Sequence, residues 1–97
     1  MLESLTIDTF AGRLGERFRI VFDPESASDA ELVEATQLSP PTGDRRAPFS
    51  LVFRVASGEP HEQRIYPVQH DELGELELFL VPIAAGEDGV RYEAVFT

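Results

Sequence analysis

Alternation of apolar and polar residues with a period of two is the feature that most limits what this chain can fold into. It recurs in four segments, at 18–22, 49–55, 75–82 and 90–96, where every second side chain is apolar. In a β-strand successive side chains point to opposite faces, so such a segment buries one row and exposes the other. Each of the four is therefore predicted to be a strand with one face on a core.

Two further segments are predicted as strands from less regular patterns. Residues 64–70 alternate in the same way, and Pro67 places them at a sheet edge or a bulge, because proline cannot donate a ladder hydrogen bond. Residues 31–37 mix helix-favouring Ala, Glu and Leu with strand-favouring Val and Thr. A strand is the favoured interpretation there, and a helix is the alternative.

One short helix is expected ahead of the strands, over residues 5–14. Leu5, Phe10 and Leu14 would share one face at near-helical spacing. Gly12 limits this helix to about two turns, because glycine is a poor helix former.

Turn signals between the strands indicate antiparallel connections. Asp88-Gly89 is a strong hairpin signal between 75–82 and 90–96. Polar loops separate the other segments, at 23–28, 39–48 and 56–62. Nothing resembles the alternation of strands and helices that a parallel sheet needs. The predicted fold is mainly β, a small antiparallel barrel or sandwich of five to six strands with one short N-terminal helix.

The length and charge of the chain restrict its partners. Ninety-seven residues fit one domain, spanning 1–97. Eighteen acidic residues against eight basic ones give a formal net charge of −10. Because such a charge repels phosphate backbones and anionic lipids, we expect neither nucleic acid nor a membrane as partner.

The location of the protein is predicted only by default. Residues 1–4 show neither the basic start nor the apolar stretch of a cleavable signal. No apolar run approaches the roughly 18 residues that cross a bilayer. We expect a cytoplasmic protein, and export as part of an assembly is left open.

The histidines, glutamates and serines of the chain do not form a recognisable catalytic or metal-binding motif. His61 and His70 are nine positions apart, which matches no metal-ligand spacing, and two surface-loop histidines explain them. Glu75 and Glu77 alternate with leucine, as the solvent face of a strand should. Ser50 lies in no nucleophile elbow. We expect no cofactor, no metal site and no enzymatic activity.

An apolar spot on the strand 75–82 is the first candidate contact surface. Phe79 and Val81 share the outward row of this strand with Glu75 and Glu77. If that face is exposed, it forms an apolar spot with a charged rim, as partner-binding patches often have. Burial of the face under the helix or a second sheet is the alternative.

A basic loop and the final strand are the other candidate surfaces. Arg45 and Arg46 stand in the loop 39–48, which is near the upper length for an unstructured connection. The final strand, 90–96, has no lysine or proline to block pairing, so strand addition at an open edge is the predicted mode of contact. Its outward row completes the candidate surface: Arg91, Glu93 and Val95.

Two functions are compatible with these features. The first is a structural or adaptor subunit that works by contact with a protein partner, with a homo-oligomer left open. The alternative is a small-ligand or carbohydrate-binding module on the same β scaffold. That module would place Tyr66, Tyr92 or the loop 39–48 at the rim of a pocket.

Several stretches of the sequence carry a resemblance to a known family: LTIDTF at 5–10, PFSLVFR at 48–54, and HDELGELELFLVP at 70–82 followed by RYEAVF at 91–96. They are similar to a family of bacterial single-domain proteins of about this length, described only as a domain of unknown function. The resemblance covers nearly the whole chain and implies no catalytic residue. Proteins of this kind are often encoded near phage-tail-collar-type proteins, which implies an accessory role in a tail-like or fibre-like assembly.

Overall fold

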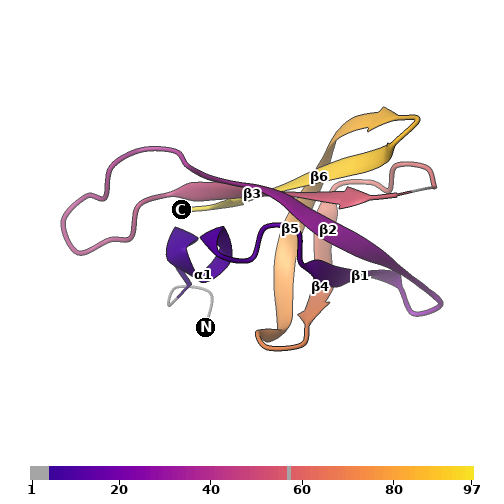
Figure 1. Ribbon diagram of the computed structural model, residues 1–97, viewed down its shortest axis with the longest axis horizontal. Helices are drawn as coiled ribbons and strands as arrows, with labels where there is room; N and C mark the ends of the chain where they lie inside the picture. The colour runs from indigo at the N-terminus through magenta and orange to yellow at the C-terminus, as the bar shows by residue number, and fades with distance from the viewer. Residues whose placement is uncertain (1–4, 57) are drawn as a thin grey trace.

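Antiparallel strands make up most of the chain, with one short helix ahead of them (Figure 1). The computed structural model describes residues 5–56 and 58–97, so the segment 1–4, in which no signal was found, lies outside it. The elements are α1 (Ile7–Ala11), β1 (Arg17–Asp23), β2 (Ser26–Gln37), β3 (Phe49–Val55), β4 (Arg64–His70), β5 (Gly74–Gly86) and β6 (Gly89–Phe96). The prediction of a mainly β fold with a short N-terminal helix is confirmed.

The six strands close into a barrel in the order β1-β2-β3-β6-β5-β4, and β4 pairs back to β1. The predicted barrel is therefore confirmed, and the alternative of a sandwich is wrong. β6 pairs with β3 from Val90 opposite Val55 to Phe96 opposite Phe49, and with β5 on its other side. The predicted open edge on the final strand is wrong over residues 89–93, where neighbouring strands occupy both edges, while the pairing with β5 does not extend to residues 94–96.

The inward rows of the strands fill the barrel, as the period of two predicts. Phe18 and Phe53 meet across the interior with ring centroids 5.1 Å apart. Phe10 of α1 packs against Phe49 and Phe96, so the helix covers one end of the barrel (Figure 1). These five phenylalanines are all buried. The interior is thus a packed core of side chains.

The helix is shorter than expected, ending at Ala11 rather than Leu14. The chain leaves the helix because Gly15 donates its backbone N–H to the carbonyl of Leu32 in β2, at 2.8 Å. Leu14 is consequently 52 % exposed and does not share the buried face of Phe10.

Two strands are longer than expected. β2 begins at Ser26, and a tight turn at Pro24 and Glu25 precedes it, in which Asp23 Oδ1 accepts the backbone N–H of Glu25 at 2.9 Å. The strand interpretation of residues 31–37 is confirmed over the helical one. β5 continues to Gly86, so the confirmed hairpin turns at residues 87–88, one position earlier than its sequence signal suggested.

β1 and β4 share the shortest ladder of the barrel, with only Arg19 opposite Gln69 and Ile20 opposite Val68. Pro67 stands where this ladder stops, while its other side still pairs with β5 opposite Glu77. The proline therefore marks the weakest seam of a closed barrel rather than a free sheet edge.

The loop between β2 and β3, residues 38–48, projects beyond the barrel (Figure 1). Its base is closed by a hydrogen bond from the N–H of Leu38 to the carbonyl of Pro48, at 2.8 Å. In the described part of the chain, no helix has the length and apolar character needed to cross a membrane.

Candidate functional site

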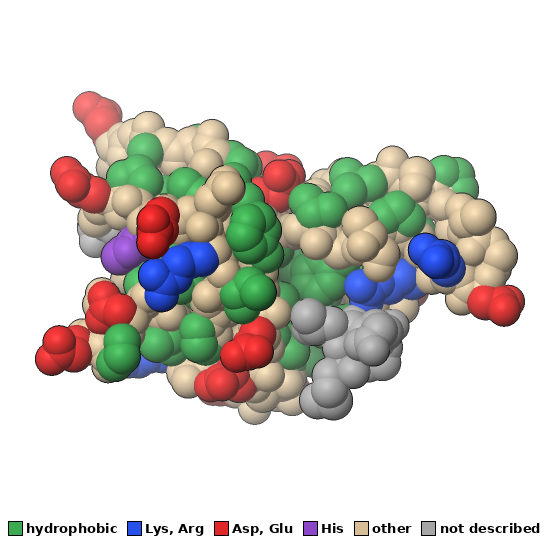
Figure 2. Space-filling model, turned by 180° about the vertical axis from the view of Figure 1, so that it is seen from behind, with side chains coloured by type: hydrophobic (Ala, Val, Ile, Leu, Met, Phe, Trp, Pro, Cys, Tyr) green, Lys and Arg blue, Asp and Glu red, His purple; other side chains and the backbone are tan. Residues whose placement is uncertain are grey.

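Three large apolar side chains lie together on the outside of the barrel. Ile65 of β4 stands opposite Phe79 of β5, and both line a shallow hollow of about 260 Å³ together with Val95 of β6. They are 61 %, 52 % and 53 % exposed, respectively. Figure 2 shows hydrophobic side chains gathered on this side of the molecule, next to the hollow at the base of the projecting loop. With Val81, two residues along the same row of β5, they form what we call the outer patch.

The expected outward rows of β5 and β6 are correct, and the helix does not cover them. Phe79 and Val95 are exposed, and Glu75 and Glu77 are exposed in the same row. Ile65 was missed, although its place between the inward Tyr66 and the loop before β4 follows from the same period of two.

A cross-strand row extends the outer patch towards β2. Val52 of β3 stands opposite Glu34 on one side and Glu93 on the other, and Glu93 in turn stands opposite Val81. Val52 is buried although it belongs to an outward row, while Glu93 is half-buried. An ionisable carboxylate is thereby held between two valines at the edge of the outer patch.

The arginines of the candidate surface are not gathered at one place. Arg46 lies over the rings of Phe49 and Phe96, and its guanidinium donates to the carbonyls of Leu5 and Thr97. It therefore holds the segment before α1 against the end of the barrel. Arg45 is exposed in the projecting loop.

Arg91, at the other end of β6, is bound within the β5–β6 hairpin. It pairs with Asp88 at 2.9 Å, and this hydrogen bond lowers the pKa of the Asp88 carboxyl. Arg54 of β3 donates to the backbone carbonyl of Asp88 at 2.7 Å. Arg91 thus stabilises a turn and lies away from the hollow of the outer patch.

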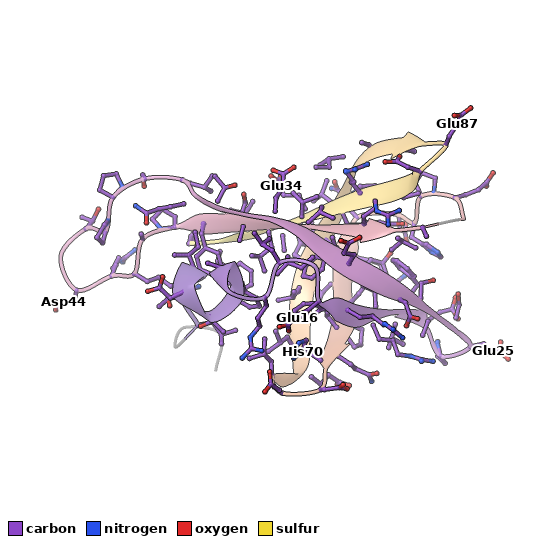
Figure 3. The ribbon with its side chains drawn as sticks, viewed as in Figure 1. Glu16, Glu25, Glu34, Asp44, His70 and Glu87 are labelled. Carbon is purple, nitrogen blue, oxygen red and sulfur yellow. The ribbon has the colours of Figure 1, made fainter. Side chains whose placement is uncertain are left out.

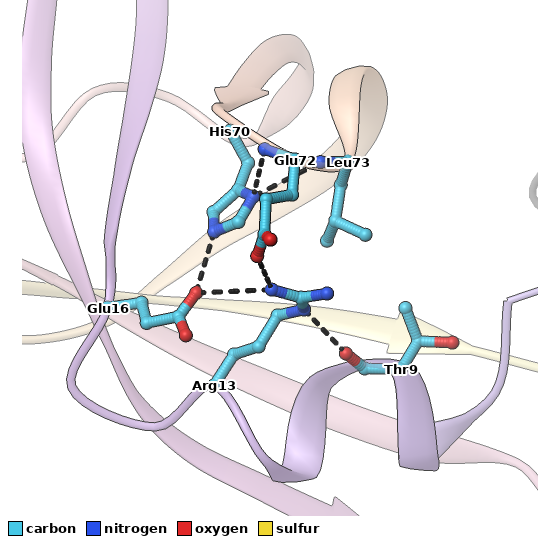
Figure 4. A network of polar contacts seen from close by, with 6 residues as sticks. All are labelled: Thr9, Arg13, Glu16, His70, Glu72 and Leu73. Atoms are coloured by element: carbon cyan, nitrogen blue, oxygen red, sulfur yellow. Dashed lines mark hydrogen bonds and ion pairs between the residues drawn. The ribbon is translucent and has the colours of Figure 1, made fainter.

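A polar network that the sequence did not suggest joins the start of β1 to the end of β4 (Figures 3 and 4). The His70 side chain is only 5 % exposed, and its Nε2 lies 2.8 Å from Glu16 Oε1. Its Nδ1 accepts the backbone N–H groups of Glu72 and Leu73 at 3.0 and 3.2 Å. Because Nδ1 accepts hydrogen bonds, the ring hydrogen is on Nε2, which donates a hydrogen bond to Glu16. The expectation of a surface-loop histidine is wrong for His70.

Arg13 completes the network from the connector after α1. Its guanidinium hydrogen-bonds Glu72 and lies 3.5 Å from Glu16, while its Nε donates to the carbonyl of Thr9 at 3.0 Å. The hydrogen bond to Glu72 raises the pKa of Arg13, and the same bond lowers the pKa of Glu72. The network fastens the helix connector to the β4–β5 turn.

An open hollow of about 700 Å³ lies beside this network. Its walls carry both charges, including Arg17 and Arg19 of β1, with Asp29 of β2 and Asp71 after β4. Both nitrogens of His70 are already used in hydrogen bonds. The residues described here contain no group of His, Asp and Glu side chains arranged to hold a metal ion. Glu16 and His70 are 54 positions apart, so no local pattern predicts their contact.

The pocket rim predicted around two tyrosines is wrong, because both rings point into the barrel. Tyr66 and Tyr92 are buried, and burial raises the pKa of the Tyr66 hydroxyl. The Tyr66 hydroxyl donates to the carbonyl of Glu62, and the Tyr92 hydroxyl accepts the N–H of His61 at 3.0 Å. The ring of His61 stacks on Phe22 at 3.9 Å. These side chains fasten the loop before β4 over the second end of the barrel.

Comparison with known proteins gives a family without an activity. Residues 5–96 match the family described as Domain of unknown function (DUF6916). The comparisons with curated proteins and with solved structures found no match. The match spans nearly the whole barrel, from the residue before the helix cap to the end of β6. The chain therefore belongs to the DUF6916 family.

Proposed function

We propose that this protein is a non-enzymatic structural or adaptor subunit that binds a protein partner through the outer patch. The observation that carries the proposal is the joint exposure of Ile65, Phe79 and Val95 on the outside of a closed barrel. These three side chains contribute little to the stability of the fold, because about half of each remains exposed to water. Contiguous exposed apolar side chains with a polar rim are the usual mark of an interaction site.

The mode of contact is side-chain packing on the outer face. Strand addition would need a longer unpaired edge than β6 offers, since β3 pairs along one side of the strand and β5 pairs along the other side from Gly89 to Glu93. The setting that we propose is a tail-like or fibre-like assembly. Support for this setting comes from the resemblance of the sequence, and support for the contact itself comes from the outer patch.

Photo-crosslinking tests the proposal. The photoreactive residue p-benzoylphenylalanine is placed at position 79, and at position 14 as a control, since Leu14 and Phe79 are both 52 % exposed. After irradiation in the native host, we expect position 79 to give one abundant cross-linked protein, identified by mass spectrometry, and position 14 to give none. Equal yields at the two positions, or no product at position 79, would refute a contact through the outer patch.

Substitution of outer-patch residues should reduce recovery of the same partner. Phe79→Ser with Val95→Ser is expected to reduce recovery of that partner about tenfold or more, because apolar side chains at the centre of a contact carry most of its binding energy. Leu14→Ser is expected to leave recovery unchanged. Thermal unfolding of each variant checks that the barrel is intact.

A further inference from the structure

Three carboxylates stand around the outer patch without a cation of their own. Glu93 and Glu34 flank Val52 in one cross-strand row, and Glu77 lines the same hollow as Phe79. Within residues 5–56 and 58–97, none of these three glutamates takes part in an ion pair or a side-chain hydrogen bond. Other acids do, including Glu16, Glu31, Glu62 and Glu72.

Two arginines near this face already make other contacts, and one of them, Arg46, lines the same hollow as Phe79. Arg64 pairs with Glu62 at 3.4 Å and lies over the ring of Tyr66. Arg46 donates to two backbone carbonyls at the end of the barrel. The chain as a whole carries a charge of −10. Three glutamates against the one guanidinium of Arg46 leave the rim of the outer patch with a net negative charge.

This charge restricts what can cover the patch. A purely apolar occupant would take Glu93, already half-buried, further out of water without a partner, and an unpaired buried charge is costly. A second copy of this chain would bring its own three carboxylates to the contact, and each chain carries a net charge of −10. A cation opposite each carboxylate removes both costs and also speeds the encounter.

We infer that the outer patch takes a basic, aliphatic segment of another protein. Its aliphatic side chains cover Ile65, Phe79 and Val95, and its arginines or lysines meet Glu93, Glu77 and Glu34. The inference rests on the proposed function and adds the chemistry of the partner to it. Arginine suits the contact best, because its planar guanidinium binds a carboxylate through two hydrogen bonds.

Selection from a random 16-residue peptide library displayed on phage tests the inference. Peptides are selected on the wild-type protein and counter-selected on the Phe79→Ser, Val95→Ser variant. We expect the peptides that depend on the outer patch to combine Leu, Ile or Val with a net positive charge. Dissociation constants of the synthetic peptides are then measured against Glu93→Gln and Glu77→Gln, with Glu25→Gln as the control, since Glu25 lies at the distant β1–β2 turn (Figure 3).

The expected results are about tenfold weaker binding for Glu93→Gln, less than twofold change for Glu25→Gln, and weaker binding as salt rises. The inference of a basic partner would be contradicted if the patch-dependent peptides were neutral or acidic, or if they bound Glu93→Gln as well as wild type. Either result would leave the proposed contact through the outer patch unaffected. A dimer in sedimentation that Phe79→Ser abolishes would do the same, with a second copy as the occupant. A selection that yields no patch-dependent peptide would count against both.

Discussion

Gly89, the first residue of β6, lies directly against the backbone at the end of β3. A Cβ at this position would come within 1.9 Å of the carbonyl oxygen of Val55, and the residue has a φ of +110°. Gly74, at the start of β5, also has a positive φ, of +77°, but has open space around it. Gly12 has the same space and an ordinary φ of −83°. Substitutions at these three glycines can therefore distinguish the cost of backbone strain from the cost of steric overlap.

Alanine substitution at these glycines should give a graded loss of stability. Gly89→Ala is expected to lower the free energy of unfolding by about 3 kcal/mol or more, since strain and overlap add. Gly74→Ala should cost about 1 kcal/mol from strain alone, and Gly12→Ala close to nothing. Urea unfolding at neutral pH measures all three. Equal losses for Gly89→Ala and Gly74→Ala would contradict the close approach of β6 to β3.

At the scale of the elements, the seam between β1 and β4 is the weak point of the closed barrel. β4 has a full ladder only towards β5, while its ladder to β1 consists of two residue pairs next to Pro67. β3, by contrast, has long ladders on both sides, to β2 and to β6. Local opening begins where the fewest backbone hydrogen bonds must break.

Hydrogen exchange should report this difference directly. Peptides covering residues 64–67 of β4 are expected to take up deuterium at least about tenfold faster than peptides covering 49–55 of β3. Mass spectrometry after exchange at neutral pH gives both rates in one experiment. Equal protection of the two segments would mean that the barrel opens only as a whole.

The ion pair between Arg13 and Glu72 ties the helix connector to the β4–β5 turn and should make stability depend on pH. Its hydrogen bond holds the pKa of Glu72 below its ordinary value in the folded state. The unfolded chain therefore takes up this proton first as the pH falls. The contribution is present above the ordinary carboxyl pKa and is lost as the pH drops through the lower, folded value.

Glu72→Gln should consequently flatten the acid side of the stability profile. Urea midpoints measured from pH 6 to pH 3 at low salt are expected to fall less in this variant than in the wild type. Glu77→Gln is the control, because Glu77 is also exposed to solvent but has no ion pair among the described residues. Parallel profiles for wild type and Glu72→Gln would show that the pair contributes nothing measurable.

Local patterns in the sequence predict the strands and their inward rows, because alternation acts over neighbouring residues. Phe49, Leu51, Phe53 and Val55 follow this rule, and so do the outward Phe79 and Val95. Closure of the barrel depends on Arg19 meeting Gln69, fifty residues apart, and no local pattern carries that information. The same limit explains why the His70–Glu16 contact was missed and why Arg45 and Arg91 were grouped with a patch from which they lie apart.

At the scale of the whole molecule, acidic side chains outnumber basic ones by more than two to one. Eighteen acids face eight arginines, and the acids reach the tips of the loops, as Glu25, Asp44 and Glu87 do (Figure 3). These three side chains make no ion pair within the part of the chain that the structure describes. Repulsion among such dispersed charges acts over longer distances than the close contacts of the ion pairs, so salt screens it more completely.

Sodium chloride should therefore stabilise this protein. Raising its concentration from 10 to 500 mM is expected to increase the free energy of unfolding by roughly 0.5–1 kcal/mol, the usual scale of surface electrostatics. The combined variant Glu25→Gln, Asp44→Asn and Glu87→Gln lowers the net charge from −10 to −7 by removing three negative charges. It should be more stable than the wild type at 10 mM salt and should gain less from added salt. If salt instead destabilises the wild type, close pairs such as Arg13–Glu72 and Arg91–Asp88 outweigh the repulsion, and the excess of acids is then tolerated by the fold at no cost in stability.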